Sequence, residues 1–196
     1  MTSAEHRFTL RGFSWGALYL LFVLGPLFAL LLGRLPPARD FWTEFATAIG
    51  YAGLAMMGLQ FGLTARFRFV TEPWGEDVIY HFHRQVSLVA VGLVGTHAVI
   101  MFAFSPEMRG LSMSIRDAPW GGVFAMVSLF SLIALVVMAL WRLKLKLRYE
   151  TWHVTHIALA VAAVVFGAAH MLGWAFYLSD PWKRMLWIGM AIFWIA

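Results

Sequence analysis

Four of the seven histidines in this sequence form two pairs with equal spacing. His83 and His97 are fourteen residues apart, and so are His156 and His170. Imidazole is the commonest metal ligand in proteins, so this repeated interval suggests metal chemistry. In a helix, fourteen residues end about 40° short of four full turns and rise about 21 Å, which puts both members of a pair on one face.

The elements that carry these histidines are predicted to be membrane helices. The chain is 61% hydrophobic and 13% charged, with a mean hydropathy of +0.75. Its apolar blocks approach or exceed the roughly 20 residues that cross a bilayer as a helix. Lipid-exposed backbone must satisfy its own hydrogen bonds, so we expect an all-α integral membrane bundle of about six transmembrane helices. The predicted helices cover residues 13–32, 41–64, 81–104, 121–141, 151–174 and 182–196, in one domain over 1–196.

Composition excludes several other classes of function. The sequence has no cysteine, which excludes disulfides, iron–sulfur clusters, thiolate-ligated haem and cysteine nucleophiles. Its carboxylates lie in predicted loops or near helix ends, whereas ion-coupled transporters usually place one near mid-membrane. The net charge of +5 is spread over short loops. It indicates contact with membrane lipid headgroups and offers no extended basic face for nucleic acid.

The distribution of lysine and arginine predicts a multi-pass protein with a cytoplasmic N-terminus, in a bacterial inner membrane or a plasma membrane. In that orientation the predicted inner loops hold the larger share of these cations, which are Arg7, Arg11, Arg66, Arg68, Arg142, Lys144, Lys146 and Arg148. The predicted outer loops hold Arg34, Arg39, Arg109, Arg116, Lys183 and Arg184. Among these outer cations, Arg109, Arg116 and Lys183 could attract an anionic chelate or could simply be solvated.

The third and fifth predicted helices cross the membrane in the same direction, so their histidines pair by depth. His83 should lie level with His156, and His97 with His170. Two facing imidazoles form the bis-axial ligand set of a b-type haem, so we expect two haem b groups stacked between these helices. The residues between the ligands are mostly small and leave room for a flat macrocycle; they are Ser87, Ala90, Val94, Ala160, Ala163 and Gly167.

Other polar residues near these helices leave alternatives open. Arg84 follows a proposed ligand directly, and it could pair with a haem propionate or snorkel to the headgroups. His81 and His153 are expected at the inner boundary, in packing or propionate contact. Each ligating imidazole should donate its second N–H to a carbonyl or hydroxyl. We predict no catalytic residue beyond the haem ligands.

Two stretches of the sequence resemble the ferric reductase-like transmembrane domain of ferric-chelate reductases and NADPH oxidases. They are YHFHRQVSLVAVGLVGTH and YETWHVTHIALAVAAVVFGAAH. The His83-Arg84 start, the approach from Tyr149 through Trp152 to His156, and the six-helix plan carry the resemblance. It implies that His83 and His156 hold the inner haem iron, and that His97 and His170 hold the outer one. It also implies a membrane oxidoreductase that passes electrons from NAD(P)H and FAD to oxygen, giving superoxide, or to a ferric chelate outside.

In that family, a cytoplasmic dehydrogenase domain carries the flavin and nicotinamide sites. This sequence contains no G-x-G-x-x-G loop on a βαβ unit, so FAD and NAD(P)H are expected only on a missing or separate domain. The apolar end at Ala196 favours continuation of the natural chain. Three alternatives remain open. They are a quinol-linked cytochrome b, a haem subunit serving a periplasmic reductase, and a non-enzymatic packing or transport subunit with structural histidines.

Overall fold

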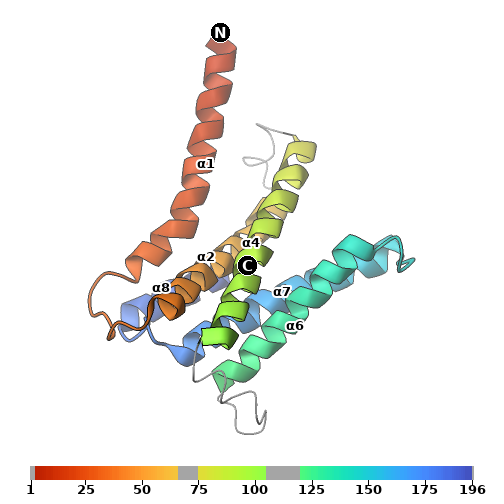
Figure 1. Ribbon diagram of the computed structural model, residues 1–196. Coiled ribbons are helices and arrows are strands. Elements are labelled where there is room, and N and C mark those ends of the chain that lie inside the picture. The colour runs from red at the N-terminus through yellow and green to blue at the C-terminus, as the bar shows by residue number, and fades with distance from the viewer. Residues whose placement is uncertain (1–2, 66–74, 105–119, 196) are drawn as a thin grey trace.

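A computed structural model of the chain describes residues 3–65, 75–104 and 120–195, with side chains from residue 12 onward. Six helices form the described part, in agreement with the predicted all-α class (Figure 1). They are α1 (Ser3–Ala29), α2 (Phe41–Thr64), α4 (Glu76–Phe104), α6 (Trp120–Trp141), α7 (Tyr149–Trp174) and α8 (Pro181–Ile195).

Five of these helices are long and apolar enough to cross a membrane, so the chain is an integral membrane protein. They are α1 through its Gly12–Ala29 part, α2, α4, α6 and α7. The sixth predicted span corresponds to α8, which has 15 described residues and is shorter than the roughly 20 that a span requires. Helix α4 begins at Glu76, before the predicted start at 81, because Glu76 and Asp77 in its first turn complement the helix dipole.

The bundle is built mainly from two helix pairs, α2 with α4 and α6 with α7. Glycine lets the backbones approach in both pairs. A Cβ on Gly53 of α2 would lie 2.7 Å from Cγ2 of Val94 on α4, and one on Gly173 of α7 would lie 3.1 Å from Cα of Gly121 on α6. Small residues of this kind are typical of close contacts between membrane helices.

Helices α4 and α7 run in the same general direction, as the count of crossings predicts. Figure 1 shows the first turns of α4 and α7 well separated. Their last turns approach each other near the N-terminal turns of α2 and α6. His97 and His170 lie in the C-terminal halves of α4 and α7, and His83 and His156 lie in the N-terminal halves.

A buried lysine ties the end of α1 to the start of α8. Lys183 is fully buried, and its Nζ donates to the carbonyl oxygens of Leu30 at 3.0 Å and Arg34 at 2.9 Å. Oδ2 of Asp180 lies 3.5 Å from the same nitrogen. A buried ammonium requires such partners because desolvation is costly. Both roles considered for Lys183 from sequence, attraction of a chelate and solvation in a loop, are therefore wrong.

Candidate functional site

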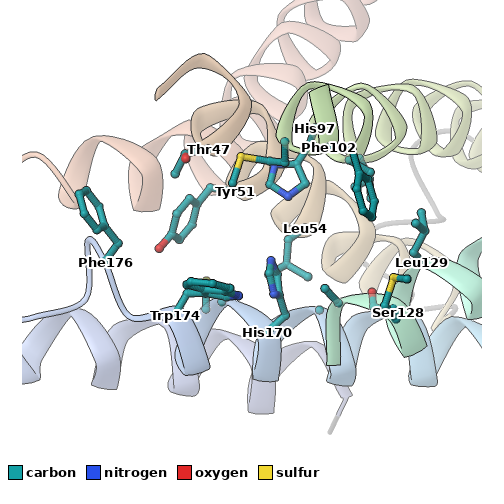
Figure 2. A pocket seen from close by; sticks show the side chains of 18 of the residues that line it. Thr47, Tyr51, Leu54, His97, Phe102, Ser128, Leu129, His170, Trp174 and Phe176 are labelled. Carbon is teal, nitrogen blue, oxygen red and sulfur yellow. The ribbon is translucent and has the colours of Figure 1, made fainter. Parts of the chain in front are cut away.

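A cavity of about 270 Å³ lies where α2, α4, α6 and α7 meet. Figure 2 shows His97 projecting into it from α4 and His170 from α7, so that the two rings face each other. Most of the remaining wall is apolar, including Leu54, Leu129 and Phe102. We call His97 and His170 the outer pair, and His83 and His156 the inner pair, after the orientation predicted above.

Each imidazole of the outer pair is oriented by a backbone carbonyl. Nδ1 of His97 lies 2.8 Å from the oxygen of Ala46, and Nδ1 of His170 lies 2.8 Å from the oxygen of Gly121. A carbonyl oxygen can only accept, so each Nδ1 carries the proton and donates it. Each Nε2 therefore keeps its lone pair, which is the arrangement of a histidine prepared to bind a metal. The two ring centroids are 6.3 Å apart, with 65° between the ring planes.

Gly50 makes room for the His97 ring. A Cβ at this position would lie 2.6 Å from Nδ1 and 2.9 Å from Cε1 of His97. Real Cβ atoms do not approach so closely, because interiors are packed at van der Waals contact. The ring can therefore reach the oxygen of Ala46, one helical turn before Gly50, only because position 50 has no side chain.

The inner pair has a different environment. His83 and His156 are partly buried. Nδ1 of each ring is buried, and no described residue accepts a hydrogen bond from it. The ring of Trp152, one turn before His156, lies 5.2 Å from that imidazole. Among the described residues, the carbonyl partners that orient the outer pair have no counterpart at this level.

Protein fills the space between the two levels on α7. Oγ of Ser128 on α6 donates to the oxygen of Ala163 at 2.7 Å. A Cβ on Gly167 would lie 3.1 Å from Leu54 and 3.2 Å from Oγ of Ser128. Some of the small residues between His156 and His170 on α7 thus serve helix packing. The cavity reaches only those near His170.

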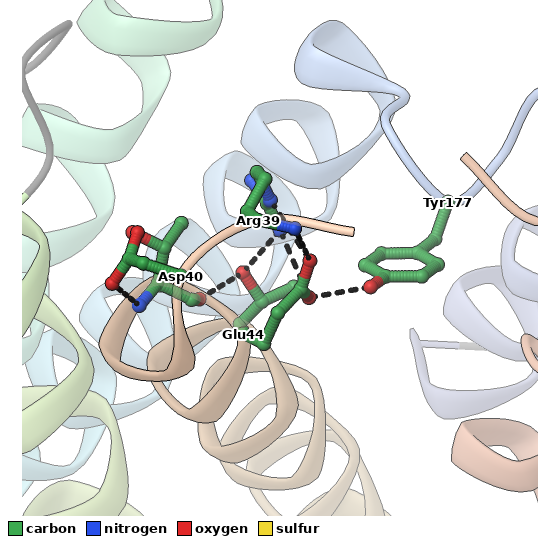
Figure 3. A network of polar contacts seen from close by, with 6 residues as sticks. Arg39, Asp40, Glu44 and Tyr177 are labelled. Carbon is green, nitrogen blue, oxygen red and sulfur yellow. Dashed lines mark hydrogen bonds and ion pairs between the residues drawn. The ribbon is translucent and has the colours of Figure 1, made fainter. Parts of the chain in front are cut away.

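A polar network forms the rim of the cavity on the outer side (Figure 3). Nε of Arg39 lies 3.2 Å from Oε1 of Glu44, and its guanidinium carbon lies 3.8 Å above the Phe176 ring. The hydroxyl of Tyr177 donates to Oε2 of Glu44. Burial and then the adjacent Glu44 carboxylate raise the pKa of Tyr177 to about 12. Hydrogen bonds from Thr43 lower the pKa of the exposed Asp40 carboxyl beside this network.

The other residues singled out from sequence lie elsewhere. Arg84 is exposed, and no described residue forms an ion pair with it. His153 is exposed and stacks on Tyr149, with centroids 5.7 Å apart. Arg109 and Arg116 lie outside the described residues.

Sequence reasoning missed the parts of the site supplied by loops and backbone. The sequence predicts Arg39 only as an outer-loop cation, although its position beside Asp40, at the start of an apolar helix, is a usable signal. Tyr177 contacts Glu44 across 133 positions, and no local pattern indicates such a contact. The carbonyl partners at Ala46 and Gly121 carry no side-chain signature at all.

Comparison with known proteins identifies the family. Residues 49–167 match the family described as Ferric reductase like transmembrane component. The match covers more than half of the chain, includes His83, His97 and His156, and ends just before His170. No curated protein and no solved structure matches the chain. The resemblance drawn from the sequence is confirmed, and the chain belongs to the ferric reductase-like transmembrane component family.

Proposed function

We propose that this chain is a di-haem cytochrome b that carries electrons across the membrane. His97 and His170 hold the iron of an outer haem b, and His83 and His156 hold the iron of an inner haem b. Electrons enter from FAD and NAD(P)H on a dehydrogenase domain or a separate reductase on the cytoplasmic side. They leave to an acceptor on the far side, either oxygen, giving superoxide, or a ferric chelate.

The observation that carries this proposal is the geometry of the outer pair. If two imidazoles bound one metal from opposite sides, their nitrogens would each lie about 2 Å from it and about 4 Å from each other. Each ring centre lies about 1 Å beyond its nitrogen, so the centroids would be about 6 Å apart. The separation of 6.3 Å between the ring centroids of His97 and His170 agrees with this value. Because Nδ1 donates to the carbonyls of Ala46 and Gly121, the neutral form of each ring has its lone pair on Nε2.

The surroundings favour a macrocycle over a bare ion. Two imidazoles are fewer than the four to six donors that a first-row metal ion takes. In the described part of the chain, no group of three or more His, Asp or Glu side chains could hold such an ion. A porphyrin supplies four donors in a plane, and the mostly apolar cavity beside Leu129 and Phe102 suits its faces.

Each element of the protein then has a defined task. A bound haem supplies one-electron exchange between ferric and ferrous iron. The two imidazoles would hold the iron from α4 and from α7, and the two carbonyls fix the direction of each ring. Leu54 and Ser128 pack against Gly167 of α7 on the cavity wall. The fourteen-residue interval separates the levels by about 21 Å, so two carriers divide a hydrocarbon core about 30 Å thick.

Support for the inner pair consists of the identical interval, the co-directional helices, and the family match that includes both His83 and His156. Both histidines lie in the N-terminal halves of their helices, as the proposed pairing requires. These observations favour the same bis-imidazole arrangement at both levels.

The test is a reduced-minus-oxidised spectrum with haem quantification on wild type and on His97→Ala. We expect two haems per chain to fall to about one, because one ligand pair holds one haem. The matched control is His153→Ala, which removes an exposed histidine and should leave the haem content at two. An unchanged haem content in His97→Ala would overturn the assignment.

A second measurement selects the acceptor. Protein reduced without oxygen is mixed with either air-saturated buffer or ferric-EDTA, and the reoxidation of its absorbance is followed. Fast reoxidation by ferric-EDTA together with slow reoxidation by oxygen would identify a chelate reductase. The opposite result, with superoxide detected, would identify an oxidase. Reoxidation by neither would contradict both proposed acceptors.

A further inference from the structure

The turn between α6 and α7 places an arginine against the aromatic side chains that lead to the inner pair. The guanidinium carbon of Arg142 lies 4.9 Å from the Trp152 ring and 5.3 Å from the Tyr149 ring. The Trp152 ring in turn lies 5.2 Å from the ring of His156. Arg142 is therefore only one aromatic side chain away from a proposed haem ligand.

Two buried hydrogen-bond donors in this cluster have no acceptor in the described part of the chain. They are Nε of Arg142 and Nε1 of Trp152. A buried donor left unsatisfied costs about 1–3 kcal/mol, and more when it is charged, so native structures rarely leave one without a partner. The nearby carboxylate does not fill this role, because Glu150 lies 3.7 Å from Nε of Arg148 instead.

The missing partner has a definite chemistry. A guanidinium and an indole N–H only donate, so the group that satisfies them must accept. Arg142 has aromatic contacts but no carboxylate partner among the described residues, so a negatively charged acceptor is favoured. Carboxylate and phosphate oxygens are the acceptors with which arginine forms its strongest, charge-assisted hydrogen bonds.

We propose that Arg142 and Trp152 form a binding site for an anionic oxygen group beside His156. This inference rests on the proposed function in one respect: the source that we favour is a propionate of the inner haem, because Trp152 contacts the ring that would hold that haem. The other source of the same chemistry is the phosphate of a lipid headgroup. Arg142 would thus share the role that the sequence allowed for Arg84, the exposed arginine next to His83.

The experiment isolates the inner level. His97→Ala protein is made without haem, placed in phosphatidylcholine nanodiscs, and titrated with haem or with haem dimethyl ester, whose propionates are uncharged. In this background, Arg142→Gln should weaken haem binding about tenfold, the loss expected for one charge-assisted hydrogen bond. It should leave binding of the ester unchanged. Arg142→Lys keeps the charge and should retain part of the preference for haem.

The matched control is Lys144→Gln, which removes an exposed cation two residues away and should change neither titration. Circular dichroism establishes that each variant has wild-type helix content. If Arg142→Gln misfolds, the ratio of haem affinity to ester affinity is compared between Arg142→Lys and the His97→Ala protein that keeps Arg142. A lower ratio in Arg142→Lys supports the site, and an equal ratio contradicts it.

A second arm distinguishes the lipid source. Each protein is moved into nanodiscs that contain phosphatidylglycerol, and retained phospholipid is measured by native mass spectrometry. Loss of retained phosphatidylglycerol in Arg142→Gln, with unchanged haem binding, supports the site with a headgroup as its ligand. No change in either haem or lipid binding overturns the site. If the His97→Ala protein that keeps Arg142 binds neither haem nor ester, the proposed function fails. The lipid measurement still tests Arg142 in that case.

Discussion

The outer and inner histidine pairs have the same spacing on the same two helices, yet their surroundings differ. Around the outer pair, both Nδ1 atoms donate to carbonyls at 2.8 Å, and the rings face each other across a cavity. At the inner pair, both Nδ1 atoms are buried without an acceptor in the described residues. Equal spacing on a helix therefore positions two ligands without determining how firmly each is oriented.

The difference arises from the helices that flank each pair. At the outer level, α2 and α6 pack closely against α4 and α7 and supply the carbonyls of Ala46 and Gly121. The same end of the molecule holds the rim around Glu44 and the buried Lys183. Toward the inner level, α4 and α7 diverge (Figure 1). The orientation of each histidine thus depends on the backbone groups around it. Among the described residues, only the outer pair has carbonyl oxygens that accept from Nδ1.

The largest expected effect comes from placing a side chain against the outer ring. Gly50→Ala brings a Cβ to 2.6 Å from Nδ1 of His97, so the ring must move and its hydrogen bond to Ala46 must break. We expect the loss of about one haem per chain, with the inner haem retained, by reduced-minus-oxidised spectroscopy. Gly95→Ala on α4 is the control, since a Cβ there meets nothing within 4 Å. Equal haem contents in the two variants would contradict the role given to Gly50.

The next effect tests whether the outer end is held by buried contacts. Lys183→Met removes the ammonium that Leu30, Arg34 and Asp180 surround, leaving a carboxylate without its cation. We expect a loss of about 3 kcal/mol in the free energy of unfolding, measured by SDS titration with circular dichroism. Lys144→Met, at an exposed inner position, should cost less than about 0.5 kcal/mol. Equal free energies of unfolding for the two variants would show that Lys183 does not stabilise the outer end.

A third measurement compares the two levels directly. His83→Ala leaves only the outer pair intact, and His97→Ala leaves only the inner pair. Loss of the groups that orient a ligand commonly costs 10–100-fold in affinity, so we expect the inner haem to transfer to apomyoglobin about tenfold faster than the outer one. His153→Ala, which keeps both pairs, should show both rates. Faster loss from the outer pair would reverse the comparison.

The smallest effect concerns the rim. The pKa of Tyr177 is raised from 10.0 to about 12, so its neutral hydroxyl stabilises the fold below pH 10, and this contribution disappears as the pH rises through 12. The stability difference between wild type and Tyr177→Phe should be constant up to pH 10 and shrink above it, by thermal unfolding at each pH. Tyr149→Phe, at an exposed position, is the control. If the stability difference between wild type and Tyr177→Phe grew with pH, the hydrogen bond to Glu44 could not be its source.

Periodicity and composition were sufficient to predict the helices and the approach of His97 to His170. Five candidate spans correspond to predicted segments, because about 20 apolar residues have few alternatives to a membrane helix. The opposition of His97 and His170 follows from the fourteen-residue interval on two co-directional helices. The haem ligands themselves, and Arg84 as a propionate partner, stay predictions.

The remaining features depend on contacts that a single helix does not encode. Ala46 and Gly121 act through their backbone oxygens, which every residue has, so only the packing of α2 and α6 selects them. Lys183 has the sequence context of a loop cation, and only the fold of residues 30–34 buries it. Helix α1 begins at Ser3, before the apolar segment at 13, because helical backbone can continue beyond the span.

The contact between Gly121 and Gly173 limits which substitutions the chain tolerates at these two positions. Gly121 both approaches the backbone of Gly173 and accepts the hydrogen bond from His170. A methyl group on Gly173 would lie 3.1 Å from Cα of Gly121 and push α6 away from α7 together with the carbonyl, and one on Gly121 would lie 2.9 Å from the Trp174 ring. In a screen of random variants, positions 121 and 173 should therefore tolerate as little change as the histidine they support, although neither residue has a functional group.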